Sequence, residues 1–261
     1  MKVLIAGVKD MSAIDLYGHF TTTVWLCGCN LKCPFCHNWK IADSLECKAM
    51  DISEAVEEIV QKVRWNEGLV EYVHLTGGEP LLWADFILEL EKATVGTAVG
   101  VSINSNFTVP FTEKAKEAVR RAQAVATDLK VPPEELYGLK REAMTTAAFS
   151  FMLWMDFIRT EAHLDVIEVR VPVFKGWMDA VSRSPIAKDL IRKVKDALTE
   201  ADALEKRLIV QRLITDPLDP RDRKWCAEKC NMPAGEVEEI AEKFREMFEG
   251  TGVEVLVNLN D

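Results

Sequence analysis

The chain has 261 residues, 48% of them hydrophobic, so it can bury a substantial core, and its formal net charge is −10. That acidic balance argues against a surface built to bind phosphate backbones, so we do not expect nucleic acid as a partner. No window approaches twenty uninterrupted apolar residues, and the N-terminal segment lacks the long apolar core of a signal peptide. We therefore expect no membrane partner and a cytoplasmic location.

Short β-rich runs alternate along the chain with amphipathic helical runs. In chain order the pattern predicts a strand at 21–26, a helix at 53–65, a strand at 72–76, a helix at 82–92, a strand at 98–104, a helix from 113, a strand at 124–128, a helix near 142–161, a strand at 166–173, a helix from 185, a strand at 208–213, a helix near 236–248 and a strand at 253–259. Thr112 and Ser184 are the predicted N-caps of two of these helices, and Pro185 suits the first turn.

This alternation predicts an α/β fold with parallel strands, because strands joined by crossover helices run parallel. Six units fall short of an eight-unit barrel, so an open partial barrel or a doubly wound sheet remains. We expect a single domain, with a core at about 18–215 and a short C-terminal βα extension at about 216–261. In either architecture the active site lies at the carboxyl ends of the strands, where the polar clusters of this sequence occur.

Seven cysteines in a cytoplasmic protein point to metal or redox chemistry rather than to a disulfide framework. Cys29, Cys33 and Cys36 lie on one loop after a predicted strand, at spacings of four and three. Closely spaced thiolates select iron–sulfur clusters, zinc or copper(I). Three ligands would leave one cubane iron open for chemistry, whereas a zinc knuckle completed by His37 or Cys27 would be structural.

The pattern CxxxCxxC, with an aromatic residue before the last cysteine, resembles the signature of the radical S-adenosylmethionine (SAM) superfamily. The wider string IDLYGHFTTTVWLCGCNLKCPFCHN is similar to the activases of glycyl radical enzymes, namely pyruvate formate-lyase and anaerobic ribonucleotide reductase. The similarity continues through GGEP, DLK and RVPV, over most of the chain. It implies a radical SAM domain with a (β/α)6 partial TIM barrel. It also implies a [4Fe–4S] cluster on Cys29, Cys33 and Cys36 whose open iron chelates SAM.

Gly77, Gly78 and Glu79 follow the second predicted barrel strand. Paired glycines let a ligand approach the backbone closely, and a carboxylate beside them can accept from an ammonium. The resemblance assigns these three residues to the methionine amino group of SAM and places Phe35 near the adenine. A plain strand-to-helix turn is the alternative explanation of this motif.

The next strands also end in polar residues. The resemblance pairs Lys130 with the methionine carboxylate and brings Arg170 close to SAM, although an ordinary interstrand salt bridge would also explain Arg170. In the activases of pyruvate formate-lyase a carboxylate, a hydroxyl and an aspartate surround a monovalent cation. The positions that match them here are Asn104, Ser105 and Asp128, and ordinary polar residues at strand ends are the alternative explanation. Asn104 removes one negative charge from that pattern and puts the cation in doubt. The late histidine of the activases has no clear match, and Gln211 stands roughly at its strand.

Four cysteines stand outside the cluster motif. Cys27 is interpreted as a core residue, and Cys47 follows the cluster loop. Cys226 and Cys230 are inert thiols, a disulfide, or part of a second metal site that uses Cys27 or Cys47. A disulfide between Cys226 and Cys230 would require non-helical geometry.

The resemblance implies an enzyme that cleaves SAM to a 5′-deoxyadenosyl radical and makes a glycyl radical on a partner enzyme. The implied partners are SAM, a glycyl radical enzyme and an electron donor of the flavodoxin or ferredoxin type. A radical SAM enzyme acting on a small molecule or a tRNA base is the alternative. A non-catalytic iron–sulfur or zinc protein would leave the GGE and DLK motifs as coincidences.

Overall fold

The computed structural model describes residues 1–215 and 219–259. In these residues nine strands form one sheet in the order β3-β1-β2-β4-β5-β6-β7-β8-β9. They are β1 (Lys2–Leu16), β2 (His19–Leu26), β3 (Lys48–Asp51), β4 (Tyr72–Gly77), β5 (Gly100–Asn104), β6 (Ala124–Asp128), β7 (His163–Val173), β8 (Asp202–Arg212) and β9 (Glu254–Asn258). Neighbours from β2 to β9 are parallel, which confirms the predicted α/β sheet, whereas β1 and β3 are antiparallel additions beyond β2.

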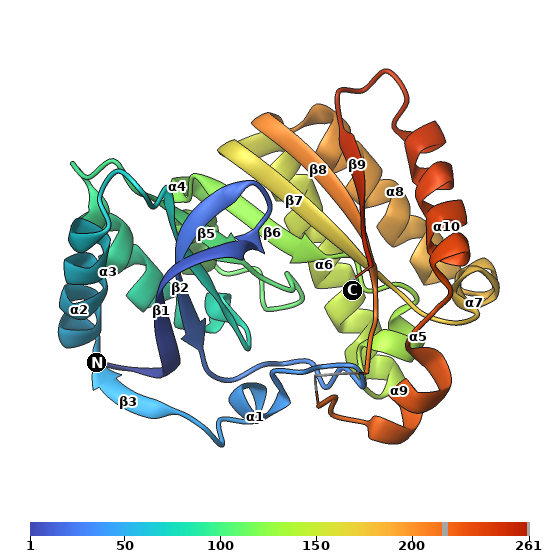
Figure 1. The fold of residues 1–261 in the computed structure, drawn as a ribbon, viewed down its shortest axis with the longest axis horizontal. Helices are drawn as coiled ribbons and strands as arrows, with labels where there is room; N and C mark the ends of the chain where they lie inside the picture. The colour runs from blue at the N-terminus through green and yellow to red at the C-terminus, as the bar shows by residue number, and fades with distance from the viewer. Residues whose placement is uncertain (216–218, 260–261) are drawn as a thin grey trace.

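The helices that connect the parallel strands lie on the outer side of the curved sheet (Figure 1). In chain order the helical segments of the described residues are α1 (Trp39–Ala42), α2 (Ile52–Trp65), the 3₁₀ turn η1 (Pro80–Trp83), α3 (Ala84–Thr94), α4 (Glu113–Arg121), α5 (Pro133–Leu136), α6 (Arg141–Glu161), α7 (Trp177–Arg183), α8 (Pro185–Glu200), α9 (Arg223–Lys229) and α10 (Ala234–Met247), of which α1 and α9 lie instead near the carboxyl ends of the strands (Figure 1). Helix α2 packs on α3, α3 on α4, and α6 on α8. No helix in the described residues is both long enough and apolar enough to cross a bilayer.

Local sequence explains where several of these helices begin. The Thr112 hydroxyl accepts a hydrogen bond from the Ala115 amide at 3.3 Å and caps α4. The Ser184 hydroxyl accepts from the Ala187 amide at 3.1 Å, and Pro185 occupies the first turn of α8. Both predicted caps are confirmed. Each satisfies one amide that lacks an intrahelical partner.

The N-terminal hairpin of β1 and β2 was not predicted, and it spans the opening of the partial barrel. Its turn reaches β7 and β8: the Tyr17 amide donates to Glu168 at 2.9 Å, and Arg207 donates to the Tyr17 carbonyl at 2.6 Å. Gly18, with a φ of +79°, allows the tight reversal between the two strands. In Figure 1 the hairpin (blue) stands across from β7, β8 and β9. The sheet therefore curls into a partial barrel, as the (β/α)6 fold class predicts.

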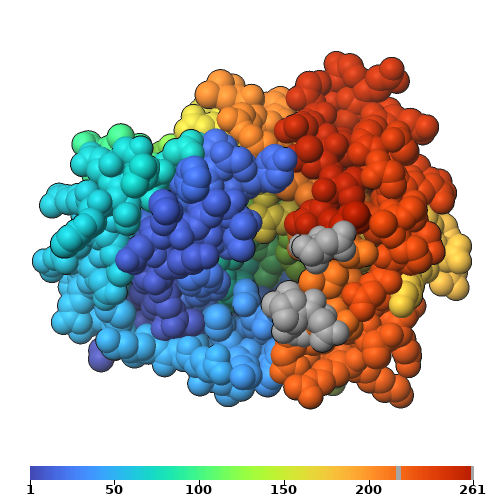
Figure 2. Space-filling view, in the orientation of Figure 1, coloured from blue at the N-terminus to red at the C-terminus, as the bar shows by residue number. Residues whose placement is uncertain are grey.

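The carboxyl ends of the parallel strands β2, β4, β5, β6, β7 and β8 border one cavity of about 320 Å³. Loops after β2, β4, β5, β6 and β8 line it. The space-filling view in Figure 2 shows the molecule hollowed between the N-terminal hairpin (blue) and the C-terminal segment (red). The fold thus leaves room for a ligand at the carboxyl ends of the strands, where the sequence predicted the active site.

Candidate functional site

Three free cysteines define the cavity. Cys29, Cys33 and Cys36 lie on the loop between β2 and α1, and all three line the cavity. Cys33 is buried, and the other two are half-buried. The structure therefore brings the three predicted cluster ligands together on one wall.

Neighbouring segments hold this loop by its backbone. The Lys32 amide donates to the Tyr137 carbonyl at 3.0 Å, and the Arg221 amide donates to the Cys36 carbonyl at 3.0 Å. A Cβ at Gly138, whose φ is +63°, would lie 1.9 Å from the Lys32 carbonyl oxygen, so only glycine fits there. The cluster loop is thus fixed from two sides before any ligand binds.

An ion pair network ties the same loop to the C-terminal part of the chain. Asp43 accepts from Arg221 at 2.6 Å and from Lys32 at 2.5 Å. The hydrogen bonds from Arg221 and then Lys32 hold the pKa of the Asp43 carboxyl at about 2. Asp43 is therefore ionised throughout the neutral range and keeps its two partners together.

The three thiols are protonated in the free protein. Burial, together with the nearby Glu79, raises the pKa of Cys29 to about 11. Burial likewise raises the pKa of Cys33 and of Cys36. A metal centre that binds here must displace these protons, because the thiolate is the ligand.

The donor set fits an iron–sulfur cubane better than a zinc knuckle. In residues 1–215 and 219–259, no three His, Cys, Asp or Glu side chains are arranged to hold a single metal ion. A cubane takes one thiolate at each of three different irons, so its ligands stand apart. Cys27, which could have completed a zinc knuckle, is bonded to Cys47.

The paired glycines lie against the cluster loop. A Cβ at Gly77 would lie 2.5 Å from the Leu26 carbonyl oxygen, and a Cβ at Gly78 would lie 2.0 Å from that of Gly28. Both glycines line the cavity. The glycines are therefore required by backbone packing, and they leave the cavity free of side chains at this point.

Glu79 lies beneath the cavity rather than on its surface. The side chain is fully buried, and its carboxylate accepts from the Leu81 amide at 2.9 Å, the Ser105 hydroxyl at 2.7 Å and the Asn106 amide at 2.7 Å. Burial raises the pKa of Glu79 and these hydrogen bonds oppose the rise. In this structure Glu79 joins the turn after β4 to the turn after β5.

The three residues suggested for a monovalent cation do not converge. Asn104 and Asp128 line the cavity, and the Asn104 amide donates to Thr76 at 3.1 Å. Ser105 is directed away to Glu79. Two of the three side chains thus remain available to a ligand.

Lys130 and Arg170 supply positive charge to the cavity, and both line it. The Lys130 ammonium donates to Asp128 at 2.6 Å. Burial alone would lower the pKa of Lys130, but the negative charge of Asp128 and its hydrogen bond raise it above its usual value. Arg170 lines the cavity and donates to Glu168 of its own strand β7 at 2.7 Å and to the Asp15 carbonyl of β1. Its salt bridge therefore lies within one strand, and the alternative of an interstrand salt bridge was wrong. Both cations are charged.

Phe35 and Gln211 both contribute to the wall of the cavity. Phe35 lines the cavity, and its ring centroid lies 6.4 Å from that of Trp225. Gln211, near the end of β8, also lines the cavity. The sequence analysis missed further lining residues, among them Asp15, Trp25, Thr76, Asn106, Leu213 and Ile214. Of these, only Asn106 had a signal, as the last residue of the Asn-Ser-Asn segment.

The four remaining cysteines form two disulfides, Cys27–Cys47 and Cys226–Cys230. The interpretation of Cys27 as a simple core residue was wrong in this respect, because strand spacing alone does not show that the loop returns Cys47 to it. Cys226 lies in α9, and Cys230 follows the helix with an extended backbone, the non-helical geometry that such a bond requires. The described residues therefore contain no second cysteine metal site.

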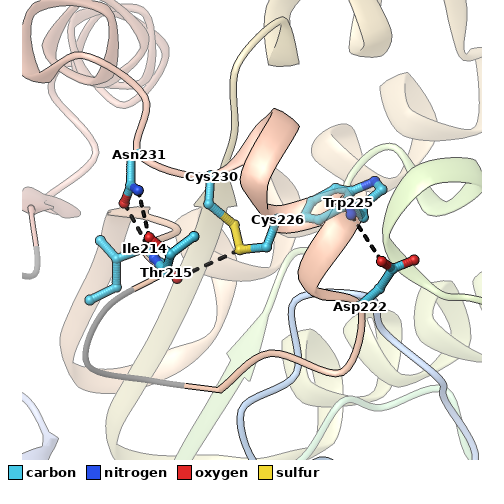
Figure 3. The surroundings of a disulfide bond; sticks show 7 residues. All are labelled: Ile214, Thr215, Asp222, Trp225, Cys226, Cys230 and Asn231. Atoms are coloured by element: carbon cyan, nitrogen blue, oxygen red, sulfur yellow. Dashed lines mark hydrogen bonds between the residues drawn. A yellow bond between two sulfur atoms is a disulfide. The ribbon is translucent and has the colours of Figure 1, made fainter.

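The Cys226–Cys230 disulfide supports the segment that closes the cavity. Figure 3 shows it beside Ile214 and Thr215, with Asn231 hydrogen-bonded to Thr215 at 2.7 Å. The backbone amide of Asn231 also donates to the Leu213 carbonyl at 2.7 Å. Leu213 and Ile214 line the cavity, so the disulfide lies directly behind its wall.

The chain is similar in sequence to a protein family and to several known proteins. The model of the Radical SAM superfamily matches residues 23–180. A Methanocaldococcus jannaschii protein named as a glycyl-radical enzyme activating enzyme is 33% identical over 132 residues, 50% of this chain and 51% of that protein. The 7-carboxy-7-deazaguanine synthase of Methanospirillum hungatei is 34% identical over 143 residues, 53% of this chain and 55% of that enzyme. The chain thus spans about half the length of these relatives.

A solved structure supports the fold. The radical SAM methyltransferase from Sphaerobacter thermophilus superposes with a TM-score of 0.55 at 14% identity, over 93% of this chain and 67% of that one. At that identity the likeness concerns the fold alone. The partial barrel is therefore shared well beyond recognisable sequence similarity.

Proposed function

The chain belongs to the radical SAM superfamily, and on this premise we propose that it reductively cleaves SAM at a [4Fe–4S] cluster held by Cys29, Cys33 and Cys36. The observation that carries the proposal is that these three free thiols line one cavity while the other four cysteines are paired elsewhere. Bound there, the cluster would supply the electron that breaks the S–C5′ bond and yields methionine and a 5′-deoxyadenosyl radical.

The chain supplies three thiolates and no fourth, so one iron is left for the amino acid part of SAM. The Lys130 ammonium has three N–H donors. One of them donates to Asp128, so the others remain for the methionine carboxylate. The Glu79 carboxylate and the Gly77–Gly78 backbone shape the adjoining floor, where we place the amino group. Arg170 adds a second positive charge on the β7 side of the cavity.

The remaining wall suits the nucleoside. Phe35 gives an aromatic face on the cluster loop itself, and Leu213 and Ile214 after β8 add apolar surface to the cavity. Apolar walls with a few placed polar groups are typical of small-molecule sites. We propose that they hold the adenosine and keep water from the radical.

For the second substrate we propose a glycine Cα–H of a partner glycyl radical enzyme, with an electron donor of the flavodoxin or ferredoxin type. Similarity to the M. jannaschii activating enzyme supports this role. The alternative is a small-molecule substrate, which the comparable similarity to 7-carboxy-7-deazaguanine synthase supports. A tRNA base fits the acidic charge less well.

Anaerobic reconstitution followed by dithionite and SAM tests the first proposal, with 5′-deoxyadenosine measured by chromatography. Absence of 5′-deoxyadenosine from cluster-loaded protein would refute it. Addition of a glycyl radical enzyme from the same organism then tests the partner, because a glycyl radical gives a doublet in the EPR spectrum. Formation of 7-carboxy-7-deazaguanine from its precursor, without that doublet, would establish the alternative.

A further inference from the structure

We propose that Asn106 is a positioning residue that donates an N–H···S hydrogen bond to Cys29 and thereby raises the reduction potential of the cluster bound there. The proposal rests on the cofactor assigned above. Asn106 Nδ2 lies 3.6 Å from Cys29 Sγ, within the range for a sulfur acceptor, and the Asn106 side chain is only 8% exposed. No role was assigned to Asn106 from its sequence context.

The orientation of the Asn106 amide follows from its other contacts. Its Oδ1 accepts from the Thr108 amide at 2.8 Å and from the Thr108 hydroxyl at 2.6 Å. The amide nitrogen therefore has to face the opposite side, toward Cys29 and Asn30.

Asn30 completes the network. Asn106 Nδ2 donates one hydrogen to Asn30 Oδ1 at 2.9 Å, and the Asn30 amide donates to the Thr108 hydroxyl at 2.8 Å. The second hydrogen on Asn106 Nδ2 is thus left for the Cys29 sulfur. A flipped amide would place oxygen against both Asn30 Oδ1 and the sulfur.

The backbone of Asn106 is equally fixed. Its backbone N–H donates to the Glu79 carboxylate at 2.7 Å, and the neighbouring Ser105 hydroxyl donates to the same carboxylate at 2.7 Å. Because Glu79 belongs to the glycine motif, that motif positions the donor next to the cluster loop. The N–H is therefore held ready before the cluster binds.

Cys29 receives a second N–H from the backbone. The Leu31 amide lies 3.4 Å from Cys29 Sγ. A backbone donor cannot be removed by substitution, but Asn106 can. N–H donors to ligand sulfurs favour the cluster state with more negative charge, which is the reduced state. Loss of the Asn106 donor should therefore make the cluster harder to reduce.

The test is a redox titration of the reconstituted protein without SAM, monitored by the EPR signal of the reduced cluster. We expect Asn106→Ala to lower the equilibrium constant for reduction at least threefold, about 28 mV at 59 mV per tenfold change. Asn106→Asp keeps the acceptor for Thr108, loses the donor and adds a negative charge, so it should shift the potential further in the same direction. The Asn106→Asp variant also allows the redox test to be made if Asn106→Ala fails to fold.

Thr108→Val is the matched control. It disturbs the same turn, but the Thr108 amide still holds Asn106 Oδ1, so the potential should stay at the wild-type value. Loaded Asn106 variants with an unchanged potential would overturn the inference and leave the proposed function intact. An equal shift in Thr108→Val would overturn it too, because turn geometry would then be the cause. Wild-type protein that assembles no cluster would instead refute the proposed cofactor.

Discussion

The Ser105 hydroxyl donates a hydrogen bond to the Glu79 carboxylate at 2.7 Å across the carboxyl ends of two adjacent parallel strands. The Asn106 amide donates to the other oxygen of the same carboxylate at 2.7 Å. Glu79 thus links the glycine motif after β4 to the turn after β5. It supports the floor of the cavity whether or not it also contacts SAM.

We expect Glu79→Ala to lower the free energy of unfolding by about 3 kcal/mol, because it leaves three buried donors without an acceptor. Ser105→Ala removes one of these donors and should cost about 1 kcal/mol. Urea denaturation of both variants measures the difference. Equal losses in the two variants would mean that the Glu79 carboxylate does not support the floor.

Substitution of any cluster cysteine should abolish the cofactor. Cys29→Ala, Cys33→Ala and Cys36→Ala each leave a cubane with two protein thiolates, so reconstituted protein should lose its iron and its brown colour. The Cys226→Ala/Cys230→Ala variant is the control and should retain about four irons, as wild type does. Full iron content in one of the three single variants would show that another residue is the ligand.

The unfolding free energy should depend on pH through Glu91 on α3. Both carboxylate oxygens of Glu91 are buried and lack a hydrogen-bond partner among the described residues, and burial raises the pKa of Glu91 from 4.5 to about 8. Between these two values the folded state holds a proton that the unfolded state has released. Stability should therefore fall as the pH rises through this window, by up to roughly 4 kcal/mol.

Glu91→Gln is uncharged at every pH and should flatten that dependence and stabilise the protein at pH 8. Glu89→Gln, on the exposed face of the same helix, is the control and should leave it unchanged. Denaturant titrations between pH 5 and 8 compare the variants. If the unfolding free energy of Glu91→Gln fell with pH as steeply as that of wild type, other groups would be the cause of the pH dependence.

The two disulfides should differ in what they contribute. Cys27 and Cys47 are 20 residues apart and enclose the whole cluster loop, whereas Cys226 and Cys230 are 4 apart. Because loop closure restricts the unfolded chain more for longer loops, Cys27→Ser/Cys47→Ser should cost about 3 kcal/mol and Cys226→Ser/Cys230→Ser clearly less. Thermal unfolding under non-reducing conditions measures both. The reverse order would point to strain or packing instead of loop closure.

The parallel strands and the cluster loop could be predicted because their signals are local. Most of strand β2 is buried, and the caps at Thr112 and Ser184 depend on residues three positions away. The hairpin strand β1 gave no such signal, because register shifts interrupt its pairing with β2 and its burial is irregular.

The environment of Glu79 could not be predicted from sequence for a different reason. Its donors Ser105 and Asn106 lie on another strand's loop and meet it only through the register of β4 and β5. The pairing of Cys27 with Cys47 similarly depends on the path of a 20-residue loop. Contacts of this kind are set by tertiary structure.

The hairpin turn that meets β7 and β8 also has a consequence for biosynthesis. Tyr17 and Arg207, which hydrogen-bond there, are 190 residues apart, so the contact of the hairpin turn with β8 can form only after the ribosome has synthesised β8. Gln211 and Leu213, which line the cavity, follow later still. Until then the three cluster thiols lack one wall of their enclosure. Delivery of iron and sulfide to the nascent chain would meet a more accessible site than delivery to the finished fold.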